Sequence, residues 1–459
     1  MVGIESYAVY LPVPRLDRAD VARVLGGRGK GTRPVASYDE DATTMGVAAA
    51  RAALRAADGV DSLWFATTRP AYLEKSNAAT VAAASGLAEE VAAYDLSGAL
   101  RGGAGALRAG LSSGNALVVA SDLRYGLPGS ADEAAGADAA AALVVGADPI
   151  AELIGSASLT SEFLDRWRIP GDVRTRTWEE RFGVEAYVPL VERIVDDVLG
   201  RCDLKREQVD HLVISTPHAR ARSTARRGFE QALFAAVDAA GLGYAGAADL
   251  AVGLAVALDA ASPGDVVLAV SVTDGADAFV FRVTDRHANG PRSGLADAPD
   301  AQPVSYGDFL NWRGLLPREP ARRPDVKPPV PPASRRSVAW KFGFVAARCG
   351  SCGYRNLPPR QVCLRCSATE GFEPEPMVDV PGRIATFTDD WLSESVQLPA
   401  RVVAVDFDGG GRFECEMTDA VGRELAIGDR VTPTFRLASV AGNGVRNYVW
   451  KVRPHLEED

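Results

Sequence analysis

The feature that most constrains this fold is a regular alternation of short β-branched runs with alanine-rich stretches over residues 1 to about 285. Strands that alternate with helices of about ten to fifteen residues are typical of βα units in a layered α/β fold. The pattern predicts strands at Gly3–Tyr10, Ser62–Ala66, Ala92–Leu96, Ala116–Ala120, Ala139–Gly146, His211–Ser215, Val266–Ser271 and Ala278–Val283. It predicts helices at Thr43–Ala57, Ala78–Ser85, Gly103–Ser112, Tyr187–Leu199, Thr224–Ala240 and Leu250–Ala261.

A weak internal symmetry divides this region. "DSLWFATTRP" and "DHLVISTPHAR" each follow an amphipathic helix and a polar turn, and a helical segment follows each of them. We therefore expect two similar halves, each bringing a strand end to a shared site. The chain has 459 residues, which is too long for one ordinary core and predicts several domains.

The predicted boundaries follow changes in composition. We expect one half at 1–160, the second at 161–290, a linker at 291–345, a cysteine-rich ribbon at 346–370 and a small barrel at 371–459. Within the linker, "VSYGDFLNWRGLL" predicts a short docking helix. The segment "PREPARRPDVKPPVPPASRR" is rich in proline and is expected to be extended or irregular.

Charge and hydropathy exclude several classes of protein. The net charge of −10 argues against general nucleic-acid binding, which needs a basic face for phosphates. No apolar run approaches the roughly 18 residues that cross a bilayer, and "MVGIESYAVYLP" resembles a first strand rather than a leader. We expect a cytoplasmic protein without a membrane or nucleic-acid partner.

Four cysteines form a metal-binding pattern. "CGSCGYRNLPPRQVCLRC" contains two C-x2-C pairs, formed by Cys349, Cys352, Cys363 and Cys366. Four thiolates satisfy tetrahedral zinc and leave no open position, so the prediction is a structural zinc ribbon. The same ligands could hold iron, or the ribbon could be empty. Cys202 and Cys415 are isolated and are expected to be core or near-surface thiols.

The chain after residue 378 reads as five short strands: "VDVPGRIATFTD", "ARVVAVDFD", "GRFECEMTD", "DRVTPTFRLAS" and "NYVWKVRP". A five-stranded small barrel after a zinc ribbon predicts a fold of the oligonucleotide/oligosaccharide-binding (OB) type. The fold itself does not decide the ligand.

Particular motifs resemble a known family. "VGIESYAVYLP", "SYDEDATTMGVAAARAAL", "AAYDLSGALRGGAGAL" and "ALDAASPGDVVLAVSVTDGADAFVFRV" are similar to the thiolase superfamily, closest to the archaeal and bacterial 3-hydroxy-3-methylglutaryl-CoA synthases. Residues 300–455 resemble the zinc-ribbon and small-barrel domain that accompanies thiolase-like enzymes. The resemblance implies a five-layer α-β-α-β-α fold, a homodimer, and carbon–carbon bond chemistry beside CoA thioesters.

The resemblance also implies a catalytic cysteine, glutamate and histidine. Placed on this sequence, they fall on Leu100, near Thr68 and on Ser215. The asparagine of the histidine motif falls on His218, and a second asparagine falls near Tyr244. Leucine cannot form a thioester, so an acyl-enzyme at that position is excluded. We therefore expect the chain not to be an ordinary hydroxymethylglutaryl-CoA synthase.

Other side chains are candidates for the chemistry. His218 follows a strand end, where it could be a general base or only a loop histidine. Asp122 and Asp274 could be catalytic carboxylates or turn formers. Candidate phenols, which are more commonly packing residues, are Tyr244, Tyr125 and Tyr72.

"ARARSTARRGFE" concentrates arginines. Arg220, Arg222 and Arg226 could bind the phosphates of CoA, because the guanidinium matches phosphate geometry, or they could belong to a solvated helix start.

Two functions remain open. The first is a cysteine-independent enzyme, a C–C lyase or acyltransferase-like protein that performs aldol or retro-aldol chemistry on a CoA thioester. The second is a non-catalytic scaffold that binds CoA species or partners an active thiolase-like subunit.

Overall fold

The computed structural model describes residues 1–57, 59–234, 242–296, 300–319, 327–393 and 395–455. The chain forms two units. Unit 1 comprises Met1–Ala36, Asp41–Ala79 and Glu90–Phe309. Unit 2 comprises Ser37–Glu40, Thr80–Glu89 and Leu310–Asp459.

Unit 1 is built on a ten-stranded mixed sheet with the order β12-β11-β13-β14-β8-β1-β7-β6-β4-β5. Its strands are β1 (Gly3–Tyr10), β4 (Ser62–Thr67), β5 (Ala92–Ser97), β6 (Ala116–Asp122), β7 (Ala139–Gly146), β8 (Ala151–Thr160), β11 (His211–Ser215), β12 (Leu233–Phe234), β13 (Val266–Thr273) and β14 (Gly275–Val283). The two halves of the sheet join where β1 pairs with the start of β8.

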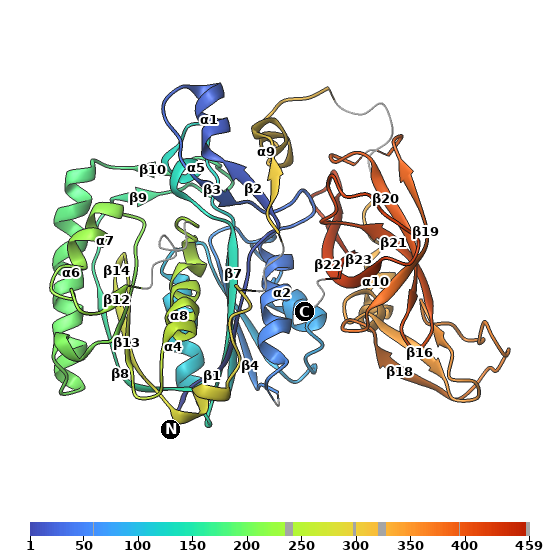
Figure 1. The fold of residues 1–459 in the computed structure, drawn as a ribbon, viewed down its shortest axis with the longest axis horizontal. Coiled ribbons are helices and arrows are strands. Elements are labelled where there is room, and N and C mark those ends of the chain that lie inside the picture. Colours follow the sequence, from blue (N-terminus) through green and yellow to red (C-terminus); the bar gives the residue numbers. More distant parts are fainter. Residues whose placement is uncertain (58, 235–241, 297–299, 320–326, 394, 456–459) are drawn as a thin grey trace. The chain divides into compact units, whose positions relative to one another are not determined.

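Helices separate and cover the two halves of the sheet (Figure 1). α2 (Ala42–Leu54) packs on β1, β6 and β7, and α6 (Glu180–Arg201) packs on β8, β13 and β14. Between the half-sheets lie α4 (Gly102–Ser113), against β4 and β6, and α8 (Asp249–Ala260), against β11 and β13. The order α6, sheet, α4 with α8, sheet, α2 confirms the predicted five-layer α-β-α-β-α fold.

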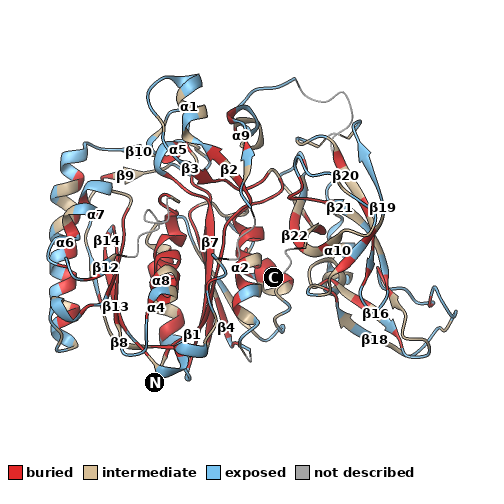
Figure 2. Ribbon diagram, in the orientation of Figure 1, coloured by how far each residue is buried: buried red, intermediate tan, exposed pale blue. Residues whose placement is uncertain are grey.

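The residue pattern explains these layers. α8 has the sequence "DLAVGLAVALDA", apolar around nearly its whole circumference, and it is buried over most of its length. Gly103 lets α4 approach the second half, because a Cβ there would lie 2.0 Å from the carbonyl oxygen of Ala247. Figure 2 shows the strands and the central helices mostly buried, whereas α6 has a buried and an exposed face.

Smaller elements complete unit 1. They are β2 (Pro14–Asp17), β3 (Thr32–Pro34), β15 (Gln302–Val304), β9 (Arg166–Trp167), β10 (Arg176–Thr177), α1 (Arg18–Leu25), α5 (Ala131–Ala135), α7 (Ala219–Ala225) and three short 3-10 turns, η1 (Arg206–Gln208), η2 (Gly246–Ala248) and η3 (Asp285–Asn289). α3 (Ala78–Ala84) begins in unit 1 and ends in the Thr80–Glu89 segment of unit 2. α9 (Tyr306–Trp312) is the short helix expected in "VSYGDFLNWRGLL". Its Tyr306 hydroxyl donates to Glu133 at 2.9 Å.

Unit 2 contains the ribbon and the barrel. β16 (Val345–Cys349) pairs with β17 (Arg355–Asn356) and β18 (Phe372–Pro376). A closed barrel follows in the order β19-β20-β21-β23-β22, from β19 (Gly382–Asp390), β20 (Ala400–Phe407), β21 (Arg412–Met417), β22 (Arg430–Val440) and β23 (Arg446–Pro454). Two short helices, α10 (Pro331–Arg336) and α11 (Val338–Lys341), precede the ribbon. The predicted five-stranded barrel is therefore present.

Three local predictions are corrected. The helix expected at 224–240 is wrong for the described residues, because α7 ends at Ala225 and Gly228 adopts a φ of +89°. Residues 235–240 of that prediction lie outside the described residues. β8 was not predicted, because "AELIGSASLT" has weak strand propensity and pairs with strands from both halves. In the proline-rich segment, 331–336 is helical rather than irregular, and 320–326 lies outside the described residues.

No helix in the described parts of the chain has both the length and the apolar character needed to span a bilayer.

Candidate active site

Polar residues gather where β4 and β6 end. The two strands are parallel neighbours, so their carboxyl ends lie at one edge of the sheet. Thr68 directly follows β4, and Asp122 is the last residue of β6. In open α/β sheets, ligands bind at this edge. η2 approaches the same place from the second half and contacts both strands.

Asp122 is the centre of this group and has no exposed surface. Its carboxylate accepts hydrogen bonds from the Thr68 hydroxyl at 2.8 Å, the Thr68 amide at 3.2 Å and the Ala247 amide at 3.0 Å. Gly246 makes the approach possible, because a Cβ there would lie 2.1 Å from Asp122 Oδ2. The buried charge is therefore held by donors from both halves of unit 1.

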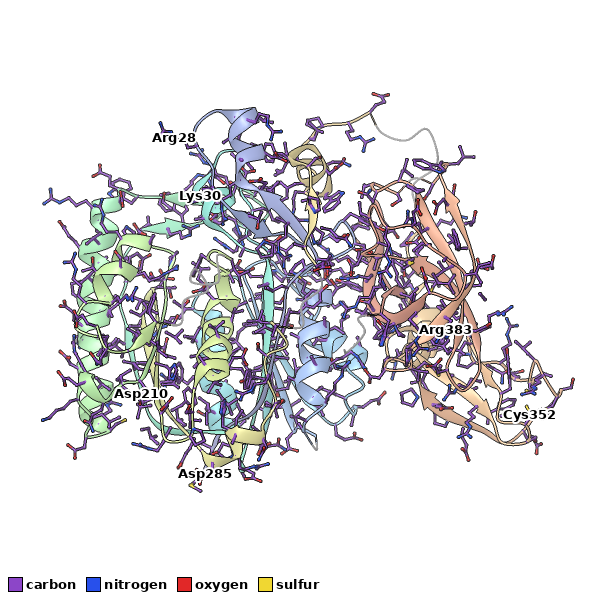
Figure 3. All side chains as sticks on the ribbon, viewed as in Figure 1. Arg28, Lys30, Asp210, Asp285, Cys352 and Arg383 are labelled. Atoms are coloured by element: carbon purple, nitrogen blue, oxygen red, sulfur yellow. The ribbon has the colours of Figure 1, made fainter. Side chains whose placement is uncertain are left out.

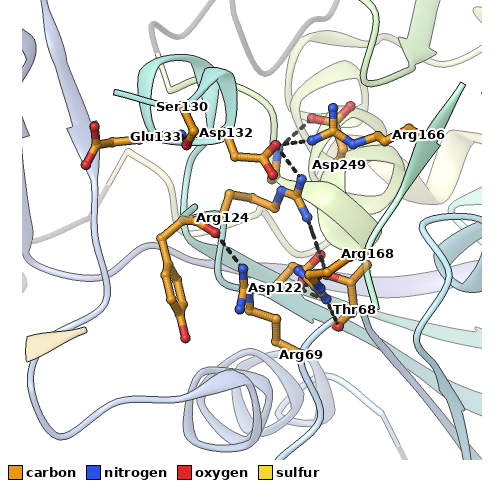
Figure 4. A network of polar contacts seen from close by, with 12 residues as sticks. Thr68, Arg69, Asp122, Arg124, Ser130, Asp132, Glu133, Arg166, Arg168 and Asp249 are labelled. Carbon is orange, nitrogen blue, oxygen red and sulfur yellow. Dashed lines mark hydrogen bonds and ion pairs between the residues drawn. The ribbon is translucent and has the colours of Figure 1, made fainter. Parts of the chain in front are cut away.

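A buried ion network continues from Asp122 (Figure 4). Arg124 Nη2 donates to Asp132 at 2.8 Å, and its Nη1 lies 3.4 Å from the Thr68 hydroxyl and 3.9 Å from Asp122. Arg166 also pairs with Asp132. Burial by itself raises the pKa of Asp132, but Arg124 and Arg166 outweigh it and hold the pKa below its usual range. Asp132 is therefore an anion that fixes two guanidinium groups beside the site.

Arg69 and Arg168 flank Thr68. Arg69 is the next residue along the chain, and Arg168 Nη2 donates to the Thr68 carbonyl. Neither these arginines nor Asp132 were predicted from the sequence. Yet "TTRP" and "SDLRYG" place arginines directly after predicted strands, and that is the signal that could have found Arg69 and Arg124. Arg166 and Arg168 come from "DRWRIP", which has no such signal.

Tyr244 lies between the two halves. Its backbone bridges to Gly136, and its ring centroid is 5.8 Å from the guanidinium carbon of Arg124 and 6.0 Å from that of Arg222. Burial first, and then Asp249, raise the pKa of Tyr244. The phenol is therefore a neutral hydroxyl at neutral pH, which can donate or accept a hydrogen bond.

The three positions that correspond to the family's catalytic residues are distributed as follows. Leu100 lies in the turn between β5 and α4, where the Gly98 amide donates to the Thr67 carbonyl at 2.9 Å. Thr68 belongs to the Asp122 group. Ser215 is buried at the end of β11 and pairs with Ser271 in β13. The structure thus brings the β5–α4 turn and Thr68 to the same sheet edge.

His218 caps the N-terminus of α7. Its Nδ1 accepts from the Ala221 amide at 3.1 Å, and its Nε2 lies 2.9 Å from the Glu180 carbonyl oxygen. Because Nδ1 accepts, the proton is on Nε2 and is donated to that carbonyl. Both ring nitrogens are therefore engaged, and the ring acts as a helix cap. Its role as a general base stays a prediction.

The predicted phosphate-binding arginines do not form one exposed patch. Arg222 is buried, and its Nη2 donates to the Thr216 carbonyl at 3.0 Å. Arg220 is exposed and lies 3.4 Å from Glu180, whereas the exposed Arg226 stacks on Phe234. Because α7 turns Arg222 toward the core, it is not part of a solvated helix start, and phosphate binding by the three arginines stays a prediction.

The remaining candidates lie apart from the Asp122 carboxylate. The ring of Tyr125 stacks on Arg69 at 3.9 Å. The Asp274 carbonyl accepts from Arg101 at 3.0 Å, and burial raises the pKa of the Asp274 carboxyl. The Tyr72 amide donates to Asn77 at 3.1 Å.

The four cysteines form a compact group in unit 2. Their sulfur atoms lie within 4.8 Å of one another, with 3.6 Å between Cys349 and Cys366 and between Cys352 and Cys363. Figure 3 shows Cys352 beside the β16–β18 sheet. A tetrahedron with Zn–S bonds of about 2.3 Å has sulfur–sulfur edges of roughly 3.8 Å. The arrangement therefore fits a closed four-thiolate metal site.

Comparisons with known proteins identify the fold and the relatives. No family model matches the chain. Hydroxymethylglutaryl-CoA synthase of Methanopyrus kandleri is 32% identical over 69% of this chain and 98% of its own, and that of Archaeoglobus fulgidus is 33% identical over 64% and 92%. The crystal structure of a hydroxymethylglutaryl-CoA synthase complexed with CoA superposes with a TM-score of 0.58, at 16% identity over 69% of this chain and 91% of that one.

These relatives correct one prediction. The expectation that the chain is not an ordinary hydroxymethylglutaryl-CoA synthase is wrong, since several synthases at about 30% identity point to an enzyme of that type. The side chains at Leu100, Thr68 and Ser215 bear on one covalent route rather than on the class of enzyme. The match over 344 residues and the five-layer fold together decide the family. This chain belongs to the hydroxymethylglutaryl-CoA synthase family of the thiolase superfamily.

Proposed function

We propose that unit 1 catalyses aldol-type carbon–carbon bond formation or cleavage on a CoA thioester, without an acyl-cysteine intermediate. Its family membership and the CoA complex of a similar enzyme support a CoA thioester as the substrate. Leu100 lies in the turn where the resemblance puts the nucleophile, and leucine has no group that accepts an acyl chain. Proton transfer and carbonyl polarisation need no nucleophilic side chain.

The observation that carries the proposal is the Thr68–Asp122 pair. The Thr68 hydroxyl lies 2.8 Å from both carboxylate oxygens and 3.4 Å from Arg124. It can take the proton from the carbon next to the thioester while it passes its own proton to Asp122. The C–H electron pair becomes the enolate, which attacks an acceptor carbonyl carbon and forms the new bond. The alkoxide then takes a proton, and the reverse sequence breaks the bond.

The surroundings suit the developing charges. Arg124 is buried and fixed by Asp132, so it can stabilise an enolate or alkoxide without reorganisation. Tyr244 is a protonated phenol near Arg124 and is the candidate donor to the alkoxide. His218 would have to release both of its hydrogen bonds to take part.

Two further proposals concern the assembly. We propose that Cys349, Cys352, Cys363 and Cys366 hold a structural zinc ion, which the sulfur geometry supports. We also propose that unit 1 forms a homodimer through β5, the last strand of the sheet order. Tyr94 on this strand is 53% exposed, and edge strands are templates for pairing with another chain.

The test is exchange of the thioester α-hydrogens with solvent. The full chain is incubated with acetyl-CoA in D2O, and deuterium uptake is followed by mass spectrometry. We expect uptake by the wild type, and Asp122→Asn lowers its rate by about 100-fold or more, because the proton acceptor is lost. Thr68→Val removes the hydroxyl at nearly constant volume and also lowers the rate. Asp274→Asn is the matched control and keeps the wild-type rate.

Two outcomes contradict the proposal. If Asp274→Asn abolishes exchange and Asp122→Asn, folded by circular dichroism, does not, the base is assigned wrongly. If the wild type exchanges neither acetyl-CoA nor the longer thioesters butyryl-CoA and glutaryl-CoA, unit 1 is a non-catalytic scaffold.

A further inference from the structure

Arg101 joins the start of α4 to the second half of unit 1. Its guanidinium has five N–H donors, and each of them has an acceptor on β8, on β14 or in the turn before β14. The acceptors are the Leu159 carbonyl at 2.7 Å, Asp277 Oδ2 at 2.8 Å, the Ser158 hydroxyl at 3.0 Å, the Asp274 carbonyl at 3.0 Å and the Thr160 hydroxyl at 3.2 Å. The second half of unit 1 therefore fixes the position of this guanidinium.

The place of Arg101 in the sequence is unfavourable for the helix that follows. Arg101 is the N-cap of α4, and the first turn of the helix consists of glycines and an alanine. N-cap residues are commonly Ser, Thr, Asp or Asn, and the positive end of the helix dipole makes a cation unfavourable there. A residue that breaks a local rule in this way is expected at a functional site.

Arg108 attaches α4 to the same two strands. It lies seven residues after Arg101, so both side chains are on one face of the helix. Its Nη2 donates to Asp277 at 3.1 Å and to the Ala157 carbonyl at 2.7 Å. The two arginines thus share one carboxylate, and Arg101 is the one at the end of α4 that reaches the candidate site.

The residues around Arg101 contact both sides of the Asp122 group. On one side, the Gly98 amide donates to the Thr67 carbonyl at 2.9 Å. On the other, Gly103 packs so closely on Ala247 that a Cβ would lie 2.0 Å from the carbonyl oxygen of that residue. Ala247 and the residue after Thr67 supply the hydrogen bonds to Asp122. A shift at the start of α4 would therefore move these donors relative to each other.

We infer that Arg101 is a positioning residue for the candidate active site. By fixing the β5–α4 turn and the first turn of α4 to β8 and β14, it keeps the donors from both halves in place around Asp122. This inference rests on the proposed function, because it takes the Asp122 group to be the reacting centre.

The first test is a kinetic comparison of two arginine variants. The exchange of acetyl-CoA α-hydrogens in D2O is measured with the full chain over a range of acetyl-CoA concentrations. We expect Arg101→Gln to lower the rate at saturation by about tenfold to a hundredfold, the effect of a misplacement of roughly 1 Å. The half-saturating concentration stays unchanged, because protein groups use all five donors of Arg101.

Two further variants separate positioning from stability. Arg108→Gln loses contacts with the same carboxylate and is the matched control, which keeps the rate at saturation. Arg101→Lys retains a positive charge beside Asp277 and is expected to restore a part of the rate.

The second test does not depend on catalysis. Backbone amide hydrogen exchange of the full chain, without a thioester, is followed by mass spectrometry on the peptide 92–107. In the wild type the amides of Gly98 and Gly102 are hydrogen-bonded. We expect Arg101→Gln to lose protection over residues 98–102, whereas Arg108→Gln keeps it.

The outcomes distinguish this inference from the proposed function. Unchanged amide protection in Arg101→Gln overturns the inference, and so does an equal loss of rate in Arg101→Gln and Arg108→Gln, which would show a general effect on stability. If the wild type exchanges no thioester α-hydrogens although Arg101→Gln loses amide protection, the proposed catalysis fails and the attachment of the turn by Arg101 stands. If Arg101→Gln does not fold by circular dichroism, Arg101→Lys takes its place in both tests.

Discussion

Asp122 is the residue at which the two halves of unit 1 meet. A carboxylate without exposed surface is stable as an ion only where donors replace its water. The donors are the hydroxyl and amide of Thr68 from the first half and the Ala247 amide from the second. One side chain thus ties the halves together and supplies a charged acceptor at the sheet edge where the fold binds ligands.

Also at the residue scale, the hydrogen bonds of His218 lead us to expect that two substitutions there change stability by different amounts. His218→Ala removes the cap of α7 and is expected to lower the free energy of unfolding by about 1 kcal/mol. His218→Asn keeps a capping side chain and most of that stability. Because both ring nitrogens are engaged, we expect His218→Asn to retain α-hydrogen exchange. Urea unfolding and the exchange assay check both. A stable His218→Asn protein that has lost exchange would identify His218 as the base.

At the scale of elements, we propose a role beyond packing within their own unit for two elements, β5 and the ribbon. β5 pairs with β4 on one side and ends the sheet order on the other. The ribbon has a three-stranded sheet and the four sulfur atoms. In the assembly that we propose, a second chain covers the edge of β5 and a metal ion holds the ribbon together.

The β5 edge leads to a prediction about assembly. Tyr94→Lys places a charge on the exposed side chain of this strand, and edge lysines block strand pairing. We expect the mass measured by light scattering to fall from that of a dimer to that of a monomer. Val24→Lys, at an exposed position on α1, is the control and stays dimeric. A Tyr94→Lys dimer with an intact circular dichroism spectrum would rule out β5 as the interface.

The ribbon leads to a prediction about metal content. Plasma emission spectrometry is expected to find one zinc ion per chain. Cys352→Ser loses the zinc, because serine replaces a thiolate ligand, and residues 346–376 become sensitive to protease since metal binding and folding are coupled. Cys202→Ser removes an isolated thiol and keeps the metal. Iron in place of zinc, or a Cys352→Ser protein with full zinc, would contradict this prediction.

At the scale of the whole molecule, unit 2 includes residues far apart in the sequence. Ser37–Glu40 belongs to it together with the barrel. Lys451 is buried and lies 3.0 Å from Asp39, and Arg436 pairs with Glu40 and lies beside Asp419. Burial by itself raises the pKa of Asp39, but Lys451 and Arg436 outweigh it and lower the pKa. An early segment of the chain thus completes the charge balance of the late domain.

This balance predicts the effect of removing Lys451. Lys451→Met leaves Asp39 buried without its partner and is expected to cost about 3–5 kcal/mol of stability at pH 7. The pKa of Asp39 is lowered in the folded state, so this stabilisation is present above about pH 4 and is lost as the pH falls further. The difference from the wild type in urea unfolding therefore narrows in acid.

The double variant Asp39→Asn/Lys451→Met is expected to recover most of the stability that Lys451→Met loses, because the buried charge is gone. Lys327→Met, at an exposed position, is the control and is expected to leave stability unchanged. An unchanged urea midpoint for Lys451→Met at pH 7 would show that the pair does not stabilise unit 2.

The sequence by itself determined most of the strands and helices and the grouping of the four cysteines. β1, β7 and β11 have the predicted bounds, because β-branched runs and glycine turns are local signals. The C-x2-C spacing similarly predicts four sulfur atoms close together, because each pair lies in one turn.

Only the tertiary structure decided which polar residues form the site. Thr68, Asp122 and Ala247 are far apart in the chain, and they meet because β4, β6 and η2 reach one sheet edge. The sequence named Asp122, Thr68 and Tyr244 as well as His218, whose ring nitrogens are both used at α7, but it could not show which of them come together. Hydrophobic period and turn chemistry act over a few residues, whereas burial and charge pairing depend on every element that packs around a group.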